Sequence, residues 1–181
     1  MVGTLDGAAL FRAHGSFVAG FLCRLGVDRS DLHDAVQEVF LIAHRCGGFT
    51  VGQAQPTTWL AEIALRVVSG QRRTLRRRAK RESVAAPDEA DLATPFDALA
   101  SHELRNRIDQ ALDTLSLEHR TVFILFEIEE ESCESIAAGL GVPIGTVYSR
   151  LHAARDRFRK AYERLTTDAA PKPRTAQREA T

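Results

Sequence analysis

Residues 132–158 read SCESIAAGLGVPIGTVYSRLHAARDRF, and this stretch decides how the C-terminal half of the chain folds. Small residues at Ala137 and Ala138 allow a second helix to cross the first one closely. Gly141 supplies the tight turn between them, because glycine adopts positive φ without steric cost. Two apolar residues four positions apart anchor the second helix from beneath: Val147 and Leu151. The stretch therefore predicts a helix-turn-helix.

The outer side of the second helix predicts contact with DNA. A recognition helix reads base edges with its N-terminal turns, because only that part enters the major groove. The residues left free there are Gly145, Thr146, Ser149, Arg150 and His152, and Tyr148 is assigned to the same DNA contact. Further along the helix, phosphates would be met by Arg155, Arg157, Arg159 and Lys160, and such contacts position a protein without reading sequence. An ordinary pair of packed helices with a solvated basic face is the alternative, and the spacing of small residues, glycine and apolar anchors favours DNA recognition.

Helical periodicity extends over almost the whole chain, with no alternating strand and no hairpin signal, so we expect an all-α protein. The other expected helices cover roughly 6–25, 30–45, 57 into the following basic stretch, the surroundings of 104–115, and a segment capped by Ser116. The glycine-rich stretch 47–56 is an expected loop. We expect two small helical domains, 1–81 and 101–165, joined by a flexible acidic linker over 82–100 and followed by a disordered tail at 166–181.

Charge is distributed in blocks although the formal net charge is zero. Residues 71–81, QRRTLRRRAKR, are strongly basic, whereas every charge from Glu82 to Glu103 is negative. Alone, the basic run fits a solvated face or a general polyanion patch as well as it fits a DNA contact. It continues an amphipathic helix, however, which favours an ordered DNA contact up to Arg77, with fraying expected from Arg78.

Three motifs in order resemble the extracytoplasmic-function (ECF) group of σ70-family RNA polymerase sigma factors. DLHDAVQEVFLIAHR (31–45) is similar to region 2.2, and TTWLAEIALRVV (57–68) with the basic run is similar to regions 2.3 and 2.4. LDTLSLEHRTVFILFEIEEESCESIAAGLGVPIGTVYSRLHAARDRFRKA (112–161) closely resembles region 4, which binds the −35 element. The resemblance covers roughly residues 8–165.

The resemblance implies a task for each block. The second helix would dock on the β′ clamp of core RNA polymerase through Asp34, Gln37, Glu38 and Leu41, and the polymerase β flap is a further implied contact. The −10 element, including a base flipped from the non-template strand, would meet Phe49, Trp59, Arg66, Arg72, Arg73, Arg76 and Arg77. The −35 element would meet the outer residues of the recognition helix together with Arg155. An anti-sigma factor is the remaining implied partner.

Several positions depart from the family pattern. Arg66 and Gly70 stand where many members carry Asn and Asp. In the recognition helix, Tyr148 and Ala153 replace a common Lys and Arg, and Glu130 replaces the usual glycine before the helix-turn-helix. These departures concern the promoter sequence that is read rather than the role.

The sequence gives no sign of an enzyme, a cofactor or a small-molecule substrate, since phosphate loops, nucleophile elbows and paired-histidine motifs are missing. His33, His44 and Cys46 lack the geometry and the fourth ligand of a metal site. Without a membrane span, a signal peptide or a disulfide pattern, we expect a cytoplasmic protein. Cys133, at an expected helix N-terminus, is either a redox-sensitive thiol or, more simply, a surface cysteine without a role.

A DNA-binding regulator that acts without polymerase is the competing hypothesis. Such a protein would use only the C-terminal helix-turn-helix, and would need to dimerise to read enough base pairs. That hypothesis explains one motif, whereas the sigma-factor hypothesis explains three.

Overall fold

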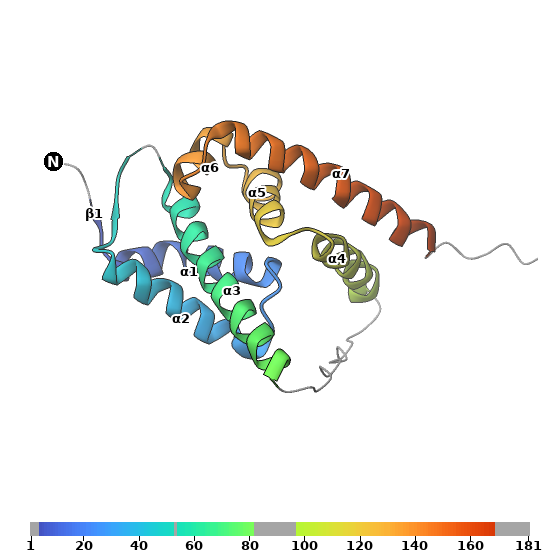
Figure 1. Ribbon diagram of the computed structural model, residues 1–181, viewed down its shortest axis with the longest axis horizontal. Coiled ribbons are helices and arrows are strands. Elements are labelled where there is room, and N and C mark those ends of the chain that lie inside the picture. Colours follow the sequence, from blue (N-terminus) through green and yellow to red (C-terminus); the bar gives the residue numbers. More distant parts are fainter. Residues whose placement is uncertain (1–3, 53, 82–96, 169–181) are drawn as a thin grey trace, which may run out of the picture.

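The computed structural model describes residues 4–52, 54–81 and 97–168, and these residues are mostly helical (Figure 1). Of their side chains, 75–81 and 97–102 lie outside the description. The elements in chain order are β1 (Thr4–Leu5), α1 (Gly7–Arg24), α2 (Arg29–Arg45), β2 (Phe49–Thr50), α3 (Pro56–Arg81), α4 (Asp97–Asp113), α5 (Leu117–Glu127), α6 (Cys133–Leu140) and α7 (Ile144–Asp168). Within the described ranges, no helix is both long enough and apolar enough to span a membrane.

Local capping signals place several helix ends. The Ser116 hydroxyl accepts a hydrogen bond from the backbone N–H of His119, and Ser132 accepts one from Ser135, so both serines are N-caps as predicted. Gly141 ends α6 in the left-handed conformation at φ 64°. Asp6 caps α1 by accepting from the N–H of Ala9 at 2.7 Å.

Two short strands are the element that the sequence did not predict. Residues Thr4–Leu5 pair antiparallel with Phe49–Thr50, inside the stretch that was expected to be only a loop. Two-residue strands show no alternation, so no periodic signal announces them. Gly48 has φ 86°, and a Cβ there would lie 3.1 Å from the Leu5 carbonyl carbon and closer still to its oxygen. Only glycine fits where β1 crosses.

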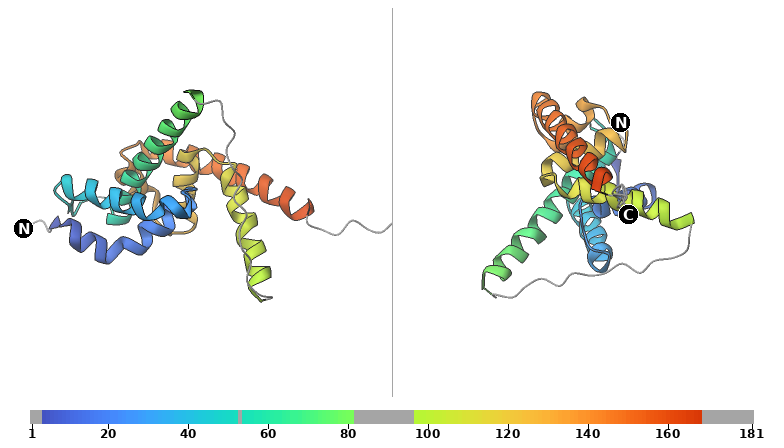
Figure 2. Two further views of the ribbon diagram at one scale, coloured as in Figure 1. Left: turned by 90° about the horizontal axis from the view of Figure 1, so that it is seen from below. Right: turned by 90° about the vertical axis from the view of Figure 1, so that its right-hand side faces the viewer.

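Helix α3 continues to Arg81, so the fraying expected from Arg78 is wrong for the backbone. The linker segment 82–96 and the tail from 169 lie outside the described residues. Figure 2 shows that the C-terminal ends of α3 and α7 extend away from each other and from the centre of the molecule.

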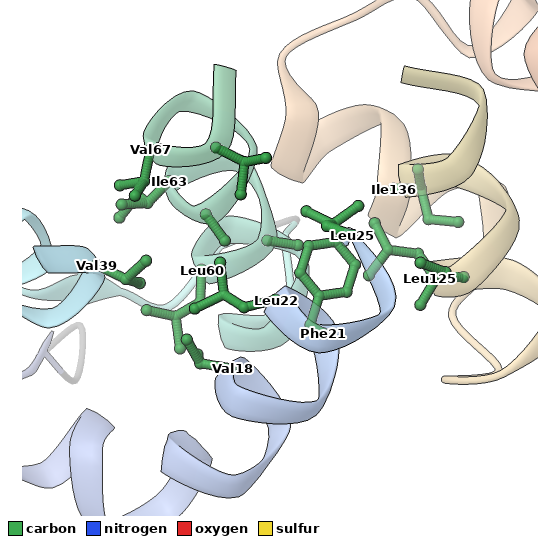
Figure 3. Close-up of a cluster of buried hydrophobic side chains, with 14 of the residues drawn as sticks. Val18, Phe21, Leu22, Leu25, Val39, Leu60, Ile63, Val67, Leu125 and Ile136 are labelled. Atoms are coloured by element: carbon green, nitrogen blue, oxygen red, sulfur yellow. The ribbon is translucent and has the colours of Figure 1, made fainter. Parts of the chain in front are cut away.

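The two helical domains share one hydrophobic core. Its residues come from α1, α2 and α3 and also from α5, α6 and α7. Figure 3 shows Phe21 of α1 and Leu25, the residue directly after α1, beside Leu125 of α5 and Ile136 of α6, and all four are fully buried. Each such side chain contributes about 1.5–3 kcal/mol relative to exposure. A smaller cluster joins α4, α5 and α7, where the rings of Phe123 and Phe158 stack at 4.7 Å.

Candidate functional site

The helix-turn-helix has the predicted anchors but a different crossing surface. Val147 and Leu151 of α7 are buried, as expected. Ala138 is exposed, however, and Ala137 is only half-buried. The small residues that α6 buries are instead Ser135 and Gly139. The expectation for the two alanines is wrong because the small face of α6 turns toward α3 rather than toward α7.

The first turns of α7 form an exposed face. Gly145, Tyr148, Ser149 and His152 are exposed, and Thr146 and Arg150 are partly buried. Tyr148 and Ile144 stand out, because these large apolar side chains are 52% and 39% exposed. Ile144 was not singled out in the sequence, since its apolar character suggests a core position. The face therefore offers hydroxyls, an imidazole, one guanidinium and apolar surface to a partner.

Arg155 lies further along α7 and is engaged with α5. Its Nε donates to Glu127 Oε1 at 2.5 Å, and its guanidinium carbon lies 4.9 Å from the centre of the Phe126 ring. A charge held over an aromatic face contributes about 0.5–1 kcal/mol at exposed sites. In this structure Arg155 therefore holds α7 against α5.

His119, at the start of α5, belongs to the same basic surface and was missed by the sequence reasoning. Burial lowers the pKa of His119 below its ordinary value of 6.5, and the nearby positive charges of Arg157 and Arg150 lower it further. Its Nδ1 lies 3.0 Å from the Ser116 hydroxyl. No spacing rule connects α5 to α7, because the fold alone brings this imidazole close to the two guanidinium groups.

The outer face of α2 has two flanks. On one flank, Gln37 and Leu41 line a hollow of about 320 Å³ together with His33, Phe11, Val36 and Phe40. Phe11 is 54% exposed and Leu41 is 46% exposed, although the Phe11 ring also meets Phe40 edge-on at 5.1 Å. Phe11 was not among the predicted residues. Its place on α1 gives no local sign that it joins α2.

The other flank of α2 faces α3. Asp34 and Glu38 line a groove of about 590 Å³ with Asp31 and with residues of α3 that include Arg66, Gln71 and Thr74. Residues four apart on a helix share a face, so the predicted polymerase set divides into the pair Asp34 and Glu38 and the pair Gln37 and Leu41. The structure keeps all four exposed.

The residues expected at the −10 element differ widely in exposure. Phe49 is buried and its ring lies 5.6 Å from that of half-buried Trp59, so Phe49 supports Trp59 from within. Arg66 is exposed and pairs with Glu62, and Arg73 is exposed. Arg72 Nη2 donates to the Leu25 carbonyl oxygen at 2.7 Å, which caps the end of α1. The side chains of Arg76 and Arg77 lie outside the description.

The cysteines do not form a reactive cluster. Cys133 is buried, contrary to the expected surface position, and burial with the charge of Glu134 raises the pKa of its thiol. A raised pKa keeps the thiol protonated and unreactive. Cys23 and Cys46 are exposed. Among the residues that the structure describes, no three His, Cys, Asp or Glu side chains gather as metal ligands would.

Comparisons with known families match both halves of the chain. The family model "Sigma-70 region 2" matches residues 10–81, and "Sigma-70, region 4" matches residues 105–158. The first spans α1 to α3, and the second spans α5, α6 and most of α4 and α7.

Curated relatives match along most of their length. The RNA polymerase sigma-H factor of Pseudomonas aeruginosa is 30% identical over 161 residues, which cover 84% of this chain and 83% of that protein. The ECF RNA polymerase sigma-E factor of Haemophilus influenzae is 33% identical over 148 residues, which cover 77% of this chain and 78% of that protein.

Two solved structures share the fold. One is the sigma factor RpoE in complex with the anti-sigma factor NepR from Bartonella quintana, with a TM-score of 0.68, 24% identity, and coverage of 84% of this chain and 94% of that one. The other is CnrH in complex with the cytosolic domain of CnrY, with a TM-score of 0.57, 20% identity, and coverage of 91% and 89%. The motifs, the two helical domains and the curated relatives agree, and the chain belongs to the ECF group of σ70-family RNA polymerase sigma factors.

Proposed function

We propose that this chain recruits core RNA polymerase through the outer face of α2 and directs it to promoters through α3 and the first turns of α7. It is a specificity subunit without chemistry of its own. The observation that carries the proposal is the exposed start of α7, held outward by buried Val147 and Leu151 in a chain whose two halves match both sigma regions.

The polymerase contact uses both flanks of α2. The hollow beside Gln37 and Leu41 offers exposed apolar surface, which is the kind of surface that anchors protein interfaces. Asp34 and Glu38 on the other flank offer charge, which steers association more than it adds affinity. We place the β′ clamp across these two flanks, with Phe11 as an additional apolar contact.

Promoter melting is assigned to the start of α3. Extruding a base costs a few kcal/mol, and a surface that receives the extruded base offsets that cost. Half-buried Trp59, supported from within by Phe49, is the stacking surface for the extruded base. The same helix has two exposed cations, Arg66 and Arg73, which contact the DNA backbone. Arg72 acts mainly by fixing α1 against α3, while Arg76 and Arg77 extend the basic surface.

Reading of the −35 element is assigned to the outer face of α7. The side chains assigned to contact base edges are Tyr148, Ser149, Arg150 and His152. The small residues Gly145 and Thr146 allow a DNA strand to approach the start of α7. Arg155 supports this surface through α5, and its phosphate contact stays a prediction.

An anti-sigma factor is a proposed partner. One structural neighbour, at 24% identity, is a sigma factor in complex with the anti-sigma factor NepR. A partner of this kind would compete with core polymerase for α2.

A pair of variants tests the assignment. Phe11→Ala with Leu41→Ala removes exposed apolar contacts, each worth about 1–2 kcal/mol in an interface, and is expected to weaken binding to purified core polymerase at least tenfold. Val51→Ala is the control, because Val51 is similarly exposed but follows β2 and belongs to neither α1 nor α2.

Arg150→Ala separates the two functions. It is expected to reduce binding to the upstream promoter element and to leave core binding intact. Unchanged core affinity in the Phe11/Leu41 variant, or unchanged upstream binding in Arg150→Ala, would contradict the corresponding assignment. Binding of promoter duplex by the chain alone, at the affinity seen with polymerase, would favour the polymerase-independent regulator instead.

A further inference from the structure

We propose that Ile144 and Tyr148, the two large apolar side chains exposed at the start of α7, read the C5-methyl group of a pyrimidine in the upstream (−35) promoter element. In unmodified DNA that pyrimidine is thymine. The inference rests on the proposed function, because it requires the outer face of α7 to meet this element. It adds Ile144 to the reading surface, and it names the chemical group that the surface selects.

The two side chains form one apolar strip. Residues four apart lie on the same side of a helix, so Ile144 and Tyr148 are neighbours in the first turns of α7. They are 39% and 52% exposed. Among the residues that the structure describes, the Tyr148 ring and its hydroxyl have neither a ring partner nor a hydrogen-bond partner. The strip is therefore available to another molecule.

Packing of α7 does not require this strip. The helix is anchored from beneath by Val147 and Leu151, which are buried. Directly before α7, Val142 packs against the same core cluster as Val147. An apolar residue that precedes the N-cap and packs with one in the first turns fixes how a chain enters a helix. Because other residues serve both tasks, the exposed apolar surface of Ile144 and Tyr148 is not needed for folding.

The strip lies on one flank of the exposed face of α7, and positive charge lies on the other. At about 100° per residue, Ile144 and Tyr148 fall on one side of the buried stripe, and Arg150 and Arg157 fall on the opposite side. Burial lowers the pKa of His119 of α5, and Arg157 and Arg150 lower it further, so this basic flank continues onto α5. Phosphates suit the basic flank, whereas the apolar flank suits an uncharged group in the groove.

The space between the flanks is open, and one of its polar groups is already engaged. The Ser149 hydroxyl donates to the Thr146 carbonyl oxygen at 3.0 Å, so its hydrogen is used within α7. A Cβ at Gly145 would lie in open space, so nothing blocks the approach of a base edge beside Ile144. This part of the face therefore reads shape and apolar surface more than hydrogen-bonding groups.

The apolar group that base pairs present in the major groove is the C5-methyl of thymine. Cytosine lacks this methyl, and apolar side chains are the residues that contact it. Burying one methyl-sized group changes a binding constant by about fourfold. The strip of Ile144 and Tyr148 thus selects thymine over cytosine through a group that hydrogen-bonding side chains do not detect. A 5-methylcytosine carries the same methyl group and should be accepted by the same strip.

Replacing thymine by uracil tests the inference, because it removes this methyl and leaves the hydrogen-bonding groups unchanged. The full-length chain bound to core polymerase first selects an upstream element from random-sequence promoters. Each thymine of that element is then replaced by uracil, and the affinity of the holoenzyme for each template is measured. We expect a loss of about threefold to fivefold at one thymine or two adjacent ones, and no change elsewhere. An upstream element without thymine, or equal affinity after every replacement, would overturn the inference.

Variants of the strip test whether these two side chains make the contact. Ile144→Ala with Tyr148→Ala is expected to bind the thymine and uracil templates equally. Tyr148→Phe keeps the ring and should keep the preference for thymine. Leu104→Ala is the matched control, because Leu104 is 46% exposed but lies on α4. If the double variant prefers thymine as strongly as the wild type does, the assignment to this strip is wrong.

Cytosine methylation separates the methyl group from the rest of thymine. At the uracil-sensitive position, a pair of 5-methylcytosine with guanine is expected to bind about threefold more tightly than the pair of cytosine with guanine. The double variant at Ile144 and Tyr148 should show no such difference. Equal affinity of the wild type for the two cytosine templates would mean that the strip does not read the methyl group, and would overturn the inference.

Core binding separates the inference from another use of the strip and from the proposed function. The double variant is expected to bind core polymerase as the wild type does. Weaker core binding with an unchanged thymine preference would assign the strip to a polymerase contact and overturn the inference. If the wild-type holoenzyme selects no upstream element, the proposed function fails together with the inference. Selection of an element that is insensitive to uracil overturns the inference alone.

Discussion

At the scale of the residue, Glu130 carries the clearest mark of strain. It has φ 56°, and it is the non-glycine residue with positive φ among those the structure describes. Left-handed backbone costs an ordinary L-residue about 1–2 kcal/mol. The family resemblance implies a glycine at this position, just before the helix-turn-helix. The sequence departure and the backbone outlier are therefore the same feature, and this chain tolerates strain that glycine would relieve.

Replacing that residue should stabilise the fold. Glu130→Gly removes the left-handed penalty. The glycine also raises the conformational entropy of the unfolded chain, which costs the folded state about 0.4–1 kcal/mol. We therefore expect the free energy of unfolding to increase by about 0.5–1 kcal/mol. Urea denaturation measures the gain. Glu134→Gly is the matched control, because the same change inside α6 should destabilise the protein by about 1 kcal/mol. A loss of stability in Glu130→Gly would show that φ at this position is not strained.

His119 predicts a pH dependence of stability. Its folded pKa lies below 6.5, so the folded chain binds fewer protons at this site than the unfolded chain. The free energy of unfolding should therefore decrease as pH falls below 6.5, and His119→Gln should flatten that decrease. Denaturation between pH 5 and 7.5 checks the slope.

His119 also predicts how binding of the −35 element responds to pH. DNA phosphates beside Arg150 and Arg157 would offset the two charges that now disfavour the imidazolium, so the pKa of His119 should rise on binding. Binding then takes up a proton, and affinity should increase as pH falls from 7.5 to 6. An unaltered pH slope in His119→Gln would place His119 outside the DNA surface.

At the scale of the element, the features that can be predicted from sequence are those set by residues close together in the chain. Helix caps act on neighbouring residues, and this is why helix ends are predictable at Ser116, Ser132 and Gly141. Helical spacing likewise predicts the buried stripe of Val147 and Leu151. The paired strands, the Arg72 cap on α1 and the position of His119 depend on which distant segments meet. Sequence periodicity does not indicate which distant segments pack together, so these three features cannot be predicted from the sequence.

The wrong expectations at this scale share one cause. The helix-turn-helix pattern indicates only α7 as a packing partner of α6, and it therefore assigns the crossing surface to Ala137 and Ala138. The structure gives α6 a second neighbour, α3, and the buried face turns to Ser135 and Gly139. Cys133 is buried for the same reason, since α6 is packed from more than one side.

Helices α5 and α7 should be coupled through Arg155. A double-mutant cycle with Arg155→Ala and Glu127→Ala is expected to give a coupling free energy of about 0.3–1 kcal/mol, because the pair is partly exposed and one bond is charge-assisted. Thermal or urea unfolding supplies the four free energies. Coupling near zero would mean that the pair does not hold the helices together, and would return Arg155 to the free phosphate contact expected from sequence.

At the scale of the whole molecule, one shared hydrophobic core joins the two regions that the family models match. The shared core explains how a chain with a segment at 82–96 between its domains can be a single compact body when it is unbound. The outer face of α2 stays exposed in this arrangement, so the surface proposed for core polymerase is accessible.

The most direct measurement is run-off transcription with purified core polymerase on a library of random-sequence promoters, with and without the full-length chain. We predict that core with this chain enriches templates that share two short elements at a fixed spacing, and that core alone, or the chain alone, enriches none. If core with the chain selects no template above core alone, the chain does not direct polymerase to promoters and the account is wrong.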